Sequence, residues 1–131
     1  MKIEHIAIWT NQLEAMKDFY CKYFDGKSND KYVNVKKKFT SYFVSFETGC
    51  RLELMSMESV PDSKDDVMDQ FTGYIHMALE VGSEGQVDKL TDILVSDGYT
   101  RIDGPRRTGD GYYESVILDP DRNRVELTAQ V

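Results

Sequence analysis

The sequence predicts an α+β fold made of two similar halves, and three observations lead to this prediction. An apolar strand, a turn and a returning strand with the pattern Arg-apolar-Glu-Leu occur twice, at 46–55 and at 117–129. Each copy is preceded by an apolar strand that contains one histidine, His5 in the first half and His76 in the second. A helix-type spacing of apolar residues follows each histidine strand. A chain of 131 residues with 40% hydrophobic residues is long enough to bury a core as a single domain.

The first half begins with a strand over 2–9, in which His5 lies among isoleucines. Asn11, with Glu14 three residues later, has the pattern of a helix start, and Gly26 is a stop signal. The apolar residues between them recur at helical spacing: Leu13, Met16, Phe19, Tyr20, Tyr23 and Phe24. A lone histidine in a strand is more often a core or edge residue, but its repeat partner favours a functional role for His5.

The rest of the first half is predicted to be a hairpin. Residues 31–38 are polar and form a short strand or a loop, 41–46 form a strand, and Glu53 lies on the strand that returns after the turn at 48–49. Residues 55–73 are rich in acidic residues and contain Pro61, which predicts a linker with at most a helical turn around 67–71.

The second half repeats this order. After a strand at 74–81, Ser83 with Gln86 predicts a capped helix that ends at Gly98. A short strand at 99–102 precedes a loop at 104–111 with three glycines and two arginines. That loop either closes over a ligand, with Arg106 or Arg107 binding an anion, or is an ordinary exposed hairpin.

The last hairpin, 117–129, carries a single carboxylate between apolar residues. Its turn, Asp119-Pro120-Asp121-Arg122-Asn123, contains the residue types that tight turns require. Glu126 stands between Val125 and Leu127, so it points to the opposite sheet face from them. That face is either solvent or a polar site. The separation from His to Glu is 48 residues in the first half (5 to 53) and 50 in the second (76 to 126), which favours a site.

The composition narrows the range of partners. A net charge of −7 argues against nucleic acid or an anionic membrane as partner, because phosphate binding requires a basic face. The lysines of 36–38, with Lys31, are predicted to be solvated rather than to bind an anion. Cys21 and Cys50 are expected to be free thiols in a reducing cytosol. With no signal peptide or apolar run of membrane length, a cytoplasmic location is expected.

The segments EHIAIWT, YIHMALEV and LDPDRNRVELT resemble strand motifs of the vicinal oxygen chelate superfamily, which includes glyoxalase I, bleomycin-binding proteins, fosfomycin-resistance proteins and extradiol dioxygenases. The resemblance covers nearly the whole chain. It implies one domain over 1–131, with two β-α-β-β-β modules at 1–57 and 73–131 joined by the acidic linker. It also implies that the paired modules form a curved, mostly antiparallel sheet around a metal cleft.

The resemblance further implies that four residues bind one divalent metal: His5, Glu53, His76 and Glu126. Two imidazoles and two carboxylates leave coordination positions open, which suits Ni, Co, Zn, Mn or Fe(II) better than a closed structural zinc site. A substrate bound through two adjacent oxygens would then undergo proton transfer α to a carbonyl, with Glu126 or Glu53 as the base.

Two departures from glyoxalase I concern the substrate. Trp9 stands where glyoxalase I has an arginine for the glutathione carboxylate, and Met57 stands where it has an asparagine. Both argue against glutathione. Trp9, Tyr42, Met55 and Met57 are instead expected to form an apolar or aromatic wall for another small ligand.

Several functions remain open at this stage. The leading prediction is a metal-dependent lyase or isomerase of the glyoxalase type acting on a small molecule. The alternatives are a metal-free binding module of the bleomycin-resistance type and a fosfomycin-type enzyme that opens an epoxide. Resemblance to small glyoxalases favours a homodimer with each site shared between the two chains over a site within one chain.

Overall fold

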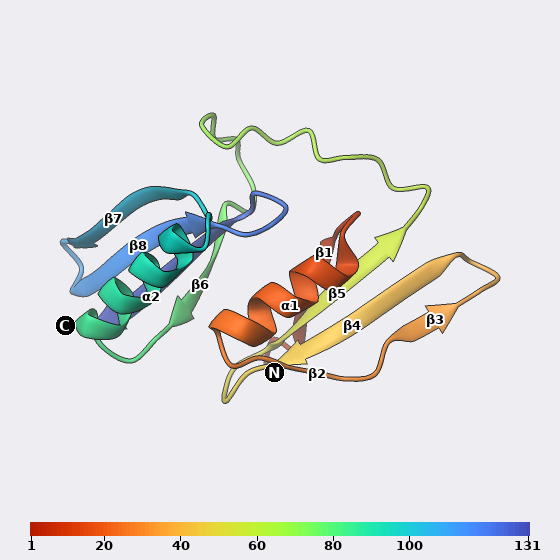
Figure 1. The fold of residues 1–131 in the computed structure, drawn as a ribbon, viewed down its shortest axis with the longest axis horizontal. Helices are drawn as coiled ribbons and strands as arrows, with labels where there is room; N and C mark the ends of the chain where they lie inside the picture. Colours follow the sequence, from red (N-terminus) through yellow and green to blue (C-terminus); the bar gives the residue numbers. More distant parts are fainter. The chain divides into compact units, whose positions relative to one another are not determined.

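A computed structural model of the protein describes residues 1–131 and divides them into two compact units, 1–64 and 65–131, which we call the first and the second module. Each module contains one helix and one β-sheet of its own (Figure 1). The predicted α+β class with two β-α-β-β-β modules is confirmed.

The first module consists of β1 (His5–Trp9), α1 (Leu13–Tyr23), β2 (Lys27–Ser28), β3 (Tyr32–Asn34), β4 (Phe39–Ser45) and β5 (Arg51–Met57). Its strand order is β1-β5-β4-β2, and β3 also pairs with β4. Strands β1 and β5 run parallel, whereas the other pairs are antiparallel. The short strands β2 and β3 pair with different parts of β4, so together they occupy the position of one interrupted strand.

The second module consists of β6 (His76–Glu80), α2 (Glu84–Ser96), β7 (Arg101–Arg107), β8 (Tyr112–Leu118) and β9 (Arg124–Gln130). Its strand order is β6-β9-β8-β7, with β6 and β9 parallel and the other pairs antiparallel. The order corresponds to that of the first module. The sequence repeat is thus a repeat of topology.

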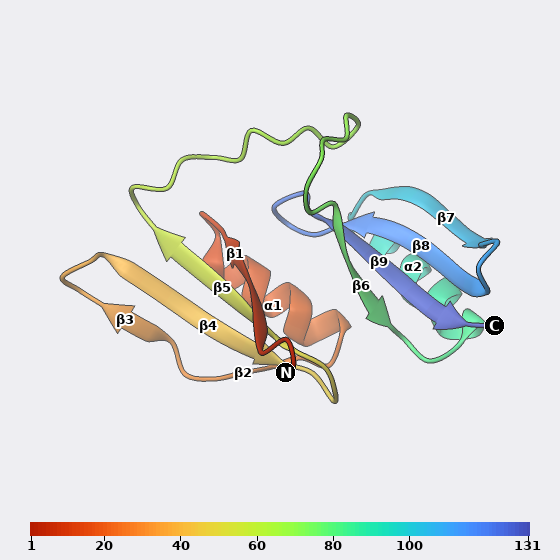
Figure 2. The same ribbon diagram turned by 180° about the vertical axis from the view of Figure 1, so that it is seen from behind.

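Each helix packs on one face of its own sheet and leaves the other face without a helix of that module (Figure 2). In the first module the core is formed by the buried residues Leu13, Met16, Phe19, Tyr20, Val44, Leu52 and Leu54. In the second it is formed by Val87, Leu94, Ile117, Val125, Leu127 and Ala129. Because strand side chains alternate between faces, Glu53 and Glu126, each between two core residues, lie on the face away from the helix, which we call the open face.

The helix starts differ from each other. Ser83 caps α2 as predicted, because its side chain accepts a hydrogen bond from the Gln86 backbone N–H at 3.3 Å. The predicted cap at Asn11 is wrong, since α1 has Gln12 at its N-cap position and no side-chain cap. The Asn11 side chain donates instead to Asp62 at 2.7 Å.

The predicted loop at 104–111 is also corrected, because β7 continues through Arg107 and only a short turn remains. Gly104 and Pro105 normally weaken a strand, but here β7 is an edge strand whose register shifts between Asp103 and Arg106. Edges and bulges are where sheets accept these residues. The linker contains no helical turn at 67–71.

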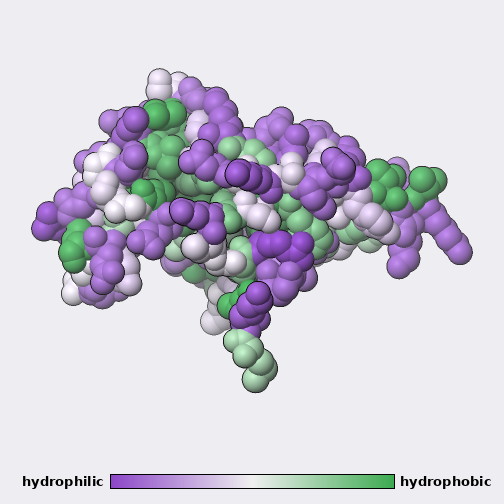
Figure 3. Space-filling view, turned by 90° about the horizontal axis from the view of Figure 1, so that it is seen from below, coloured by the Kyte–Doolittle hydropathy of each residue, from purple (hydrophilic) through white to green (hydrophobic).

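Charged side chains make up 30% of the chain, and hydrophilic residues occupy much of the surface seen in Figure 3, with separate apolar groups among them. Neither helix is long and apolar enough to cross a membrane.

Candidate metal-binding residues on two equivalent sheet faces

The first histidine and glutamate lie side by side on the open face of the first module. His5 Nε2 is 3.5 Å from Glu53 Oε2. The parallel pairing of β1 with β5 sets Ala7 opposite Glu53, so the histidine lies two residues before the position that faces the carboxylate. The Glu53 side chain is 16% exposed and that of His5 is 39% exposed, which leaves the pair accessible to a ligand.

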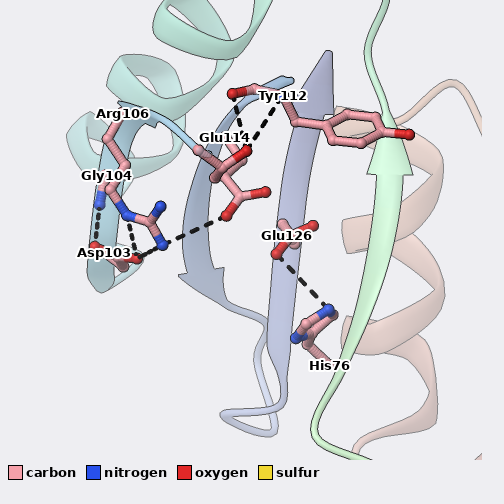
Figure 4. Close-up of polar contacts among 8 residues, drawn as sticks. His76, Asp103, Gly104, Arg106, Tyr112, Glu114 and Glu126 are labelled. Atoms are coloured by element: carbon pink, nitrogen blue, oxygen red, sulfur yellow. Dashed lines mark hydrogen bonds and ion pairs between the residues drawn. The ribbon is translucent and has the colours of Figure 1, made fainter. Parts of the chain in front are cut away.

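The second pair repeats this arrangement. His76 Nε2 is 3.7 Å from Glu126 Oε2 (Figure 4). Ala78 lies opposite Glu126 in the parallel pairing of β6 with β9. These pairs contain both histidines of the chain. The equivalence inferred from the sequence therefore extends to strand, register and sheet face.

The donor atoms suit a divalent ion. An imidazole nitrogen and a carboxylate oxygen each bind such an ion at roughly 2.0–2.2 Å, so two ligands at right angles are about 3 Å apart. The observed separations of 3.5 and 3.7 Å are close to this value. No group of three or more histidine, cysteine, aspartate or glutamate side chains has the geometry of a metal site in this structure. Each module thus contributes a pair of potential ligands.

Glu4 is a site residue that the sequence prediction missed. Its carboxylate makes close contacts with His5 Nδ1 and with the Arg51 guanidinium. The hydrogen bond with His5, and next the contacts with Arg51, lower the pKa of Glu4. A metal-binding histidine commonly donates its second ring N–H to a carboxylate, which orients the ring. Glu4 is placed to do this for His5 and leaves Nε2 facing Glu53.

Glu114 is a second missed residue. It lies on β8, on the same open face as Glu126 (Figure 4). In the strand register it is opposite Thr128, and its side chain is 14% exposed. Burial and the nearby charge of Glu126 raise the pKa of Glu114, while Arg106 opposes this shift. The sequence contained one signal for it, a glutamate within the apolar strand 112–118.

The two predicted anion-binding arginines both have carboxylate partners within their own module. Arg106 donates from Nε and Nη2 to Asp103 at 2.9 and 2.8 Å, and its Nη2 lies 3.4 Å from Glu114 (Figure 4). Arg106 lowers the pKa of Asp103. Arg107 lies 2.8 Å from Glu84 at the start of α2. Anion binding by either arginine stays a prediction, and it would have to compete with these carboxylates.

The predicted apolar wall is partly corrected. Trp9, Met55 and Met57 share the open face with Glu53, as the strand registers require. Tyr42 does not, because it lies opposite Leu54 and its hydroxyl donates to Glu14 of α1 at 3.2 Å. Phe43, the next residue, faces the site instead, with its ring 5.4 Å from the His5 ring in an edge-to-face arrangement.

One surface depression adjoins this wall and shares Met57 with it. Its lining residues are Lys37, Lys38, Met57, Glu58 and Ser59. It contains neither histidine nor the two glutamates of the pairs. We therefore place the candidate site at the His-Glu pairs and not at this depression.

Together, the fold and the pairs define a protein of two β-α-β-β-β modules, each presenting one imidazole and one carboxylate on an open sheet face. The family model described as the Glyoxalase/Bleomycin resistance protein/Dioxygenase superfamily matches residues 2–127, and the chain belongs to this superfamily.

A curated relative, the uncharacterized protein YqjT of Bacillus subtilis (strain 168), is 42% identical over 60 residues, which are 44% of this chain and 47% of the relative. The match thus spans about half of that protein.

Solved structures share the fold. A trypanothione-dependent glyoxalase I of Leishmania major has a TM-score of 0.77 at 22% identity, over 97% of this chain and 85% of that one. A domain of the same superfamily from Frankia sp. EAN1pec has a TM-score of 0.79 at 15% identity, over 100% and 98%. A glyoxalase I mutant from Zea mays has a TM-score of 0.78 at 24% identity, over 97% and 44%.

Proposed function

We propose that the protein is a metal-dependent lyase or isomerase of the glyoxalase type, in which His5, Glu53, His76 and Glu126 bind one divalent ion. The observation that carries the proposal is the equivalent placement of the two His-Glu pairs, at 3.5 and 3.7 Å in matching strand registers. A purely structural role for these residues would not require an accessible imidazole beside a carboxylate in both modules.

The bound ion would supply Lewis-acid stabilisation of negative charge on a substrate oxygen. The residues of the chain supply the rest of the mechanism. Glu126, mostly shielded from solvent beside His76, accepts the proton α to the substrate carbonyl and returns it to the neighbouring carbon; Glu53 is the other candidate for this step. Glu4 orients the His5 ring through its contact with Nδ1.

Metal uptake tests this proposal directly. Protein without a histidine tag would be stripped of metal and titrated with Ni, Co, Zn, Mn and Fe(II) ions, followed by elemental analysis and thermal melting. We expect uptake to raise the melting temperature, since a ligand at about 100 times its Kd stabilises the folded state by about 2.7 kcal/mol.

Variants separate the proposed site from other binding. His5→Ala and His76→Ala should each greatly weaken uptake, whereas Glu80→Gln, an exposed carboxylate on β6, should leave it unchanged. If the wild-type protein takes up none of these ions, the enzyme proposal fails and a metal-free binding module of the bleomycin-resistance type becomes the better explanation. If metal binds but only epoxide opening is found, with protection of cells from fosfomycin, the glyoxalase-type reaction is wrong.

We also propose a homodimer in which each metal takes one His-Glu pair from each of two chains. Co-expression of His5→Ala with His76→Ala tests this. In a shared arrangement, a heterodimer collects both lesions in one site and leaves the other intact, so one ion per heterodimer binds tightly. If all four ligands come from one chain, every site carries a lesion, and the heterodimer binds no more tightly than either variant alone.

A further inference from the structure

The surroundings of the two His-Glu pairs differ, although the pairs themselves are equivalent. Matching strand registers allow a position-by-position comparison of the two open faces. Three positions are apolar in the first module and polar in the second. Trp9 corresponds to Glu80, Met55 to Thr128, and Met57 to Gln130. The second module folds without apolar residues there, so the fold of a module does not require them.

Aromatic rings extend the apolar surface of the first module. The Trp9 ring lies 6.0 Å from that of Phe39, edge to face, and the Tyr32 ring lies 6.1 Å from Phe39 on the other side. Phe39 pairs with Met57, and Trp9 pairs with Met55. The edge-to-face contact favours one relative orientation of the Trp9 and Phe39 rings, and the Tyr32 ring is tilted by 60° from that of Phe39. We call these five residues the aromatic strip.

The aromatic strip begins close to the candidate metal ligands. Met55 is two residues after Glu53 on β5, so their Cα atoms are about 7 Å apart. If the two adjacent oxygens of a ligand are held near His5 and Glu53, a ring of about the size of a phenyl group on the same ligand can therefore contact the aromatic strip. Trp9 is 42% exposed, so a large apolar surface is still available for contact.

Resting on the proposed function, we infer that the aromatic strip binds a planar aromatic group of the substrate, whose two vicinal oxygens lie at the His5-Glu53 pair. The substrate class is thus an aryl compound with adjacent oxygen atoms rather than a short aliphatic one. Ring stacking on Trp9 and Met55, together with an edge contact from Phe39, supplies the selectivity.

Three neutral hydroxamic acids serve as probes, because all carry the same pair of adjacent oxygens: benzohydroxamic, cyclohexanecarbohydroxamic and acetohydroxamic acid. Trp9 is the only tryptophan, so its single indole N–H resonance reports binding at the strip in zinc-loaded protein. We expect the benzo compound to bind at least ~10-fold more tightly than the acetyl compound, with the planar ring preferred over cyclohexyl, and the indole signal to shift.

Matched variants locate the effect. Phe39→Leu should remove most of the preference for the aromatic probe, and Trp9→Leu, measured by calorimetry, should do the same. Tyr112→Leu is the control, because Tyr112 holds the equivalent position in the second module, opposite Gln130, and it should change nothing. Equal affinity for the three probes, no indole shift, or an effect of Tyr112→Leu as large as that of Phe39→Leu would overturn the inference.

The experiment separates this inference from the proposed function. If zinc does not bind but the metal-free protein still prefers the aromatic probe at Trp9, the enzyme proposal fails while the aromatic strip stands as a ligand site. If one zinc ion binds through the two His-Glu pairs together but the protein shows no preference for the aromatic probe, the metal proposal stands and the substrate class is wrong.

Discussion

Replacing Gly104 with alanine should strongly destabilise the second module. Gly104 has φ of +71°, a left-handed conformation that costs an L residue roughly 1–2 kcal/mol. Its added Cβ would lie 2.4 Å from the Glu114 carbonyl oxygen and 2.8 Å from Ser115 Cα. These are backbone atoms of β8 and cannot rotate away, so overpacking adds about 1–3 kcal/mol. We expect a total loss of about 2–5 kcal/mol.

The expected change in melting temperature follows from chain length. At an unfolding entropy of about 2.1 cal/mol/K per residue, a chain of 131 residues loses roughly 4 °C for each kcal/mol if it unfolds in one step. Gly104→Ala should therefore melt about 8–20 °C below the wild type. Circular dichroism during heating, together with urea unfolding at 25 °C, would measure the loss.

Gly85→Ala is the matched control. Gly85 lies in the first turn of α2, and an added Cβ there meets no atom within 4 Å. Alanine is the better helix former by about 0.5–1 kcal/mol, so this variant should melt slightly higher. If Gly104→Ala melts within a degree of the wild type, β7 does not approach β8 as closely as described, and the placement of Arg106 against Glu114 loses its support.

Three further changes have defined outcomes. Glu126→Gln should keep most of its metal, since an amide oxygen still coordinates, but lose about 10²–10⁴-fold in turnover of α-oxo hemithioacetals; unchanged turnover would remove Glu126 from proton transfer. The raised pKa of Glu114 means that the folded state binds more protons than the unfolded state above about pH 4.5, so this group makes stability fall as pH rises. Glu114→Gln should therefore reduce the fall in melting temperature between pH 4 and 8. A variant whose melting temperature depends on pH as steeply as that of the wild type would contradict this role of Glu114. Ser83→Ala should cost about 1 kcal/mol in urea unfolding through loss of the α2 cap, and a loss below ~0.3 kcal/mol would show that the bond to Gln86 contributes little.

Much of the placement of the candidate site residues was predictable because it depends on local patterns. The two His strands and the two Arg-apolar-Glu-Leu strands alternate with period 2, so the face of Glu53 and Glu126 follows once Leu52, Leu54, Val125 and Leu127 are assigned to the core. The helix capped by Ser83 follows from its own sequence in the same way. The repeat then identifies His5 and His76 as equivalent without any tertiary information.

Other features depended on tertiary contacts. Strand β4 has aromatic residues on both faces, so alternation alone did not show that Tyr42 points to α1 while Phe43 points to His5. Strand β7 can include Gly104 and Pro105 because it is an edge strand with a bulge. Its edge position depends on how the strands pair in the sheet, and the residues of β7 alone do not show it.

The sequence by itself determined the two-module α+β fold, the four candidate ligands and an apolar wall that contains Trp9. The tertiary structure alone decided that Glu4 contacts His5, that Arg106 lies between Asp103 and Glu114, and that Phe39 joins Trp9 in one aromatic strip. The physical reason is that the spacing of apolar residues along a strand or helix and the capping of a helix are local properties of the chain. A contact between side chains on different strands depends on register and on strand pairing, which the whole module fixes.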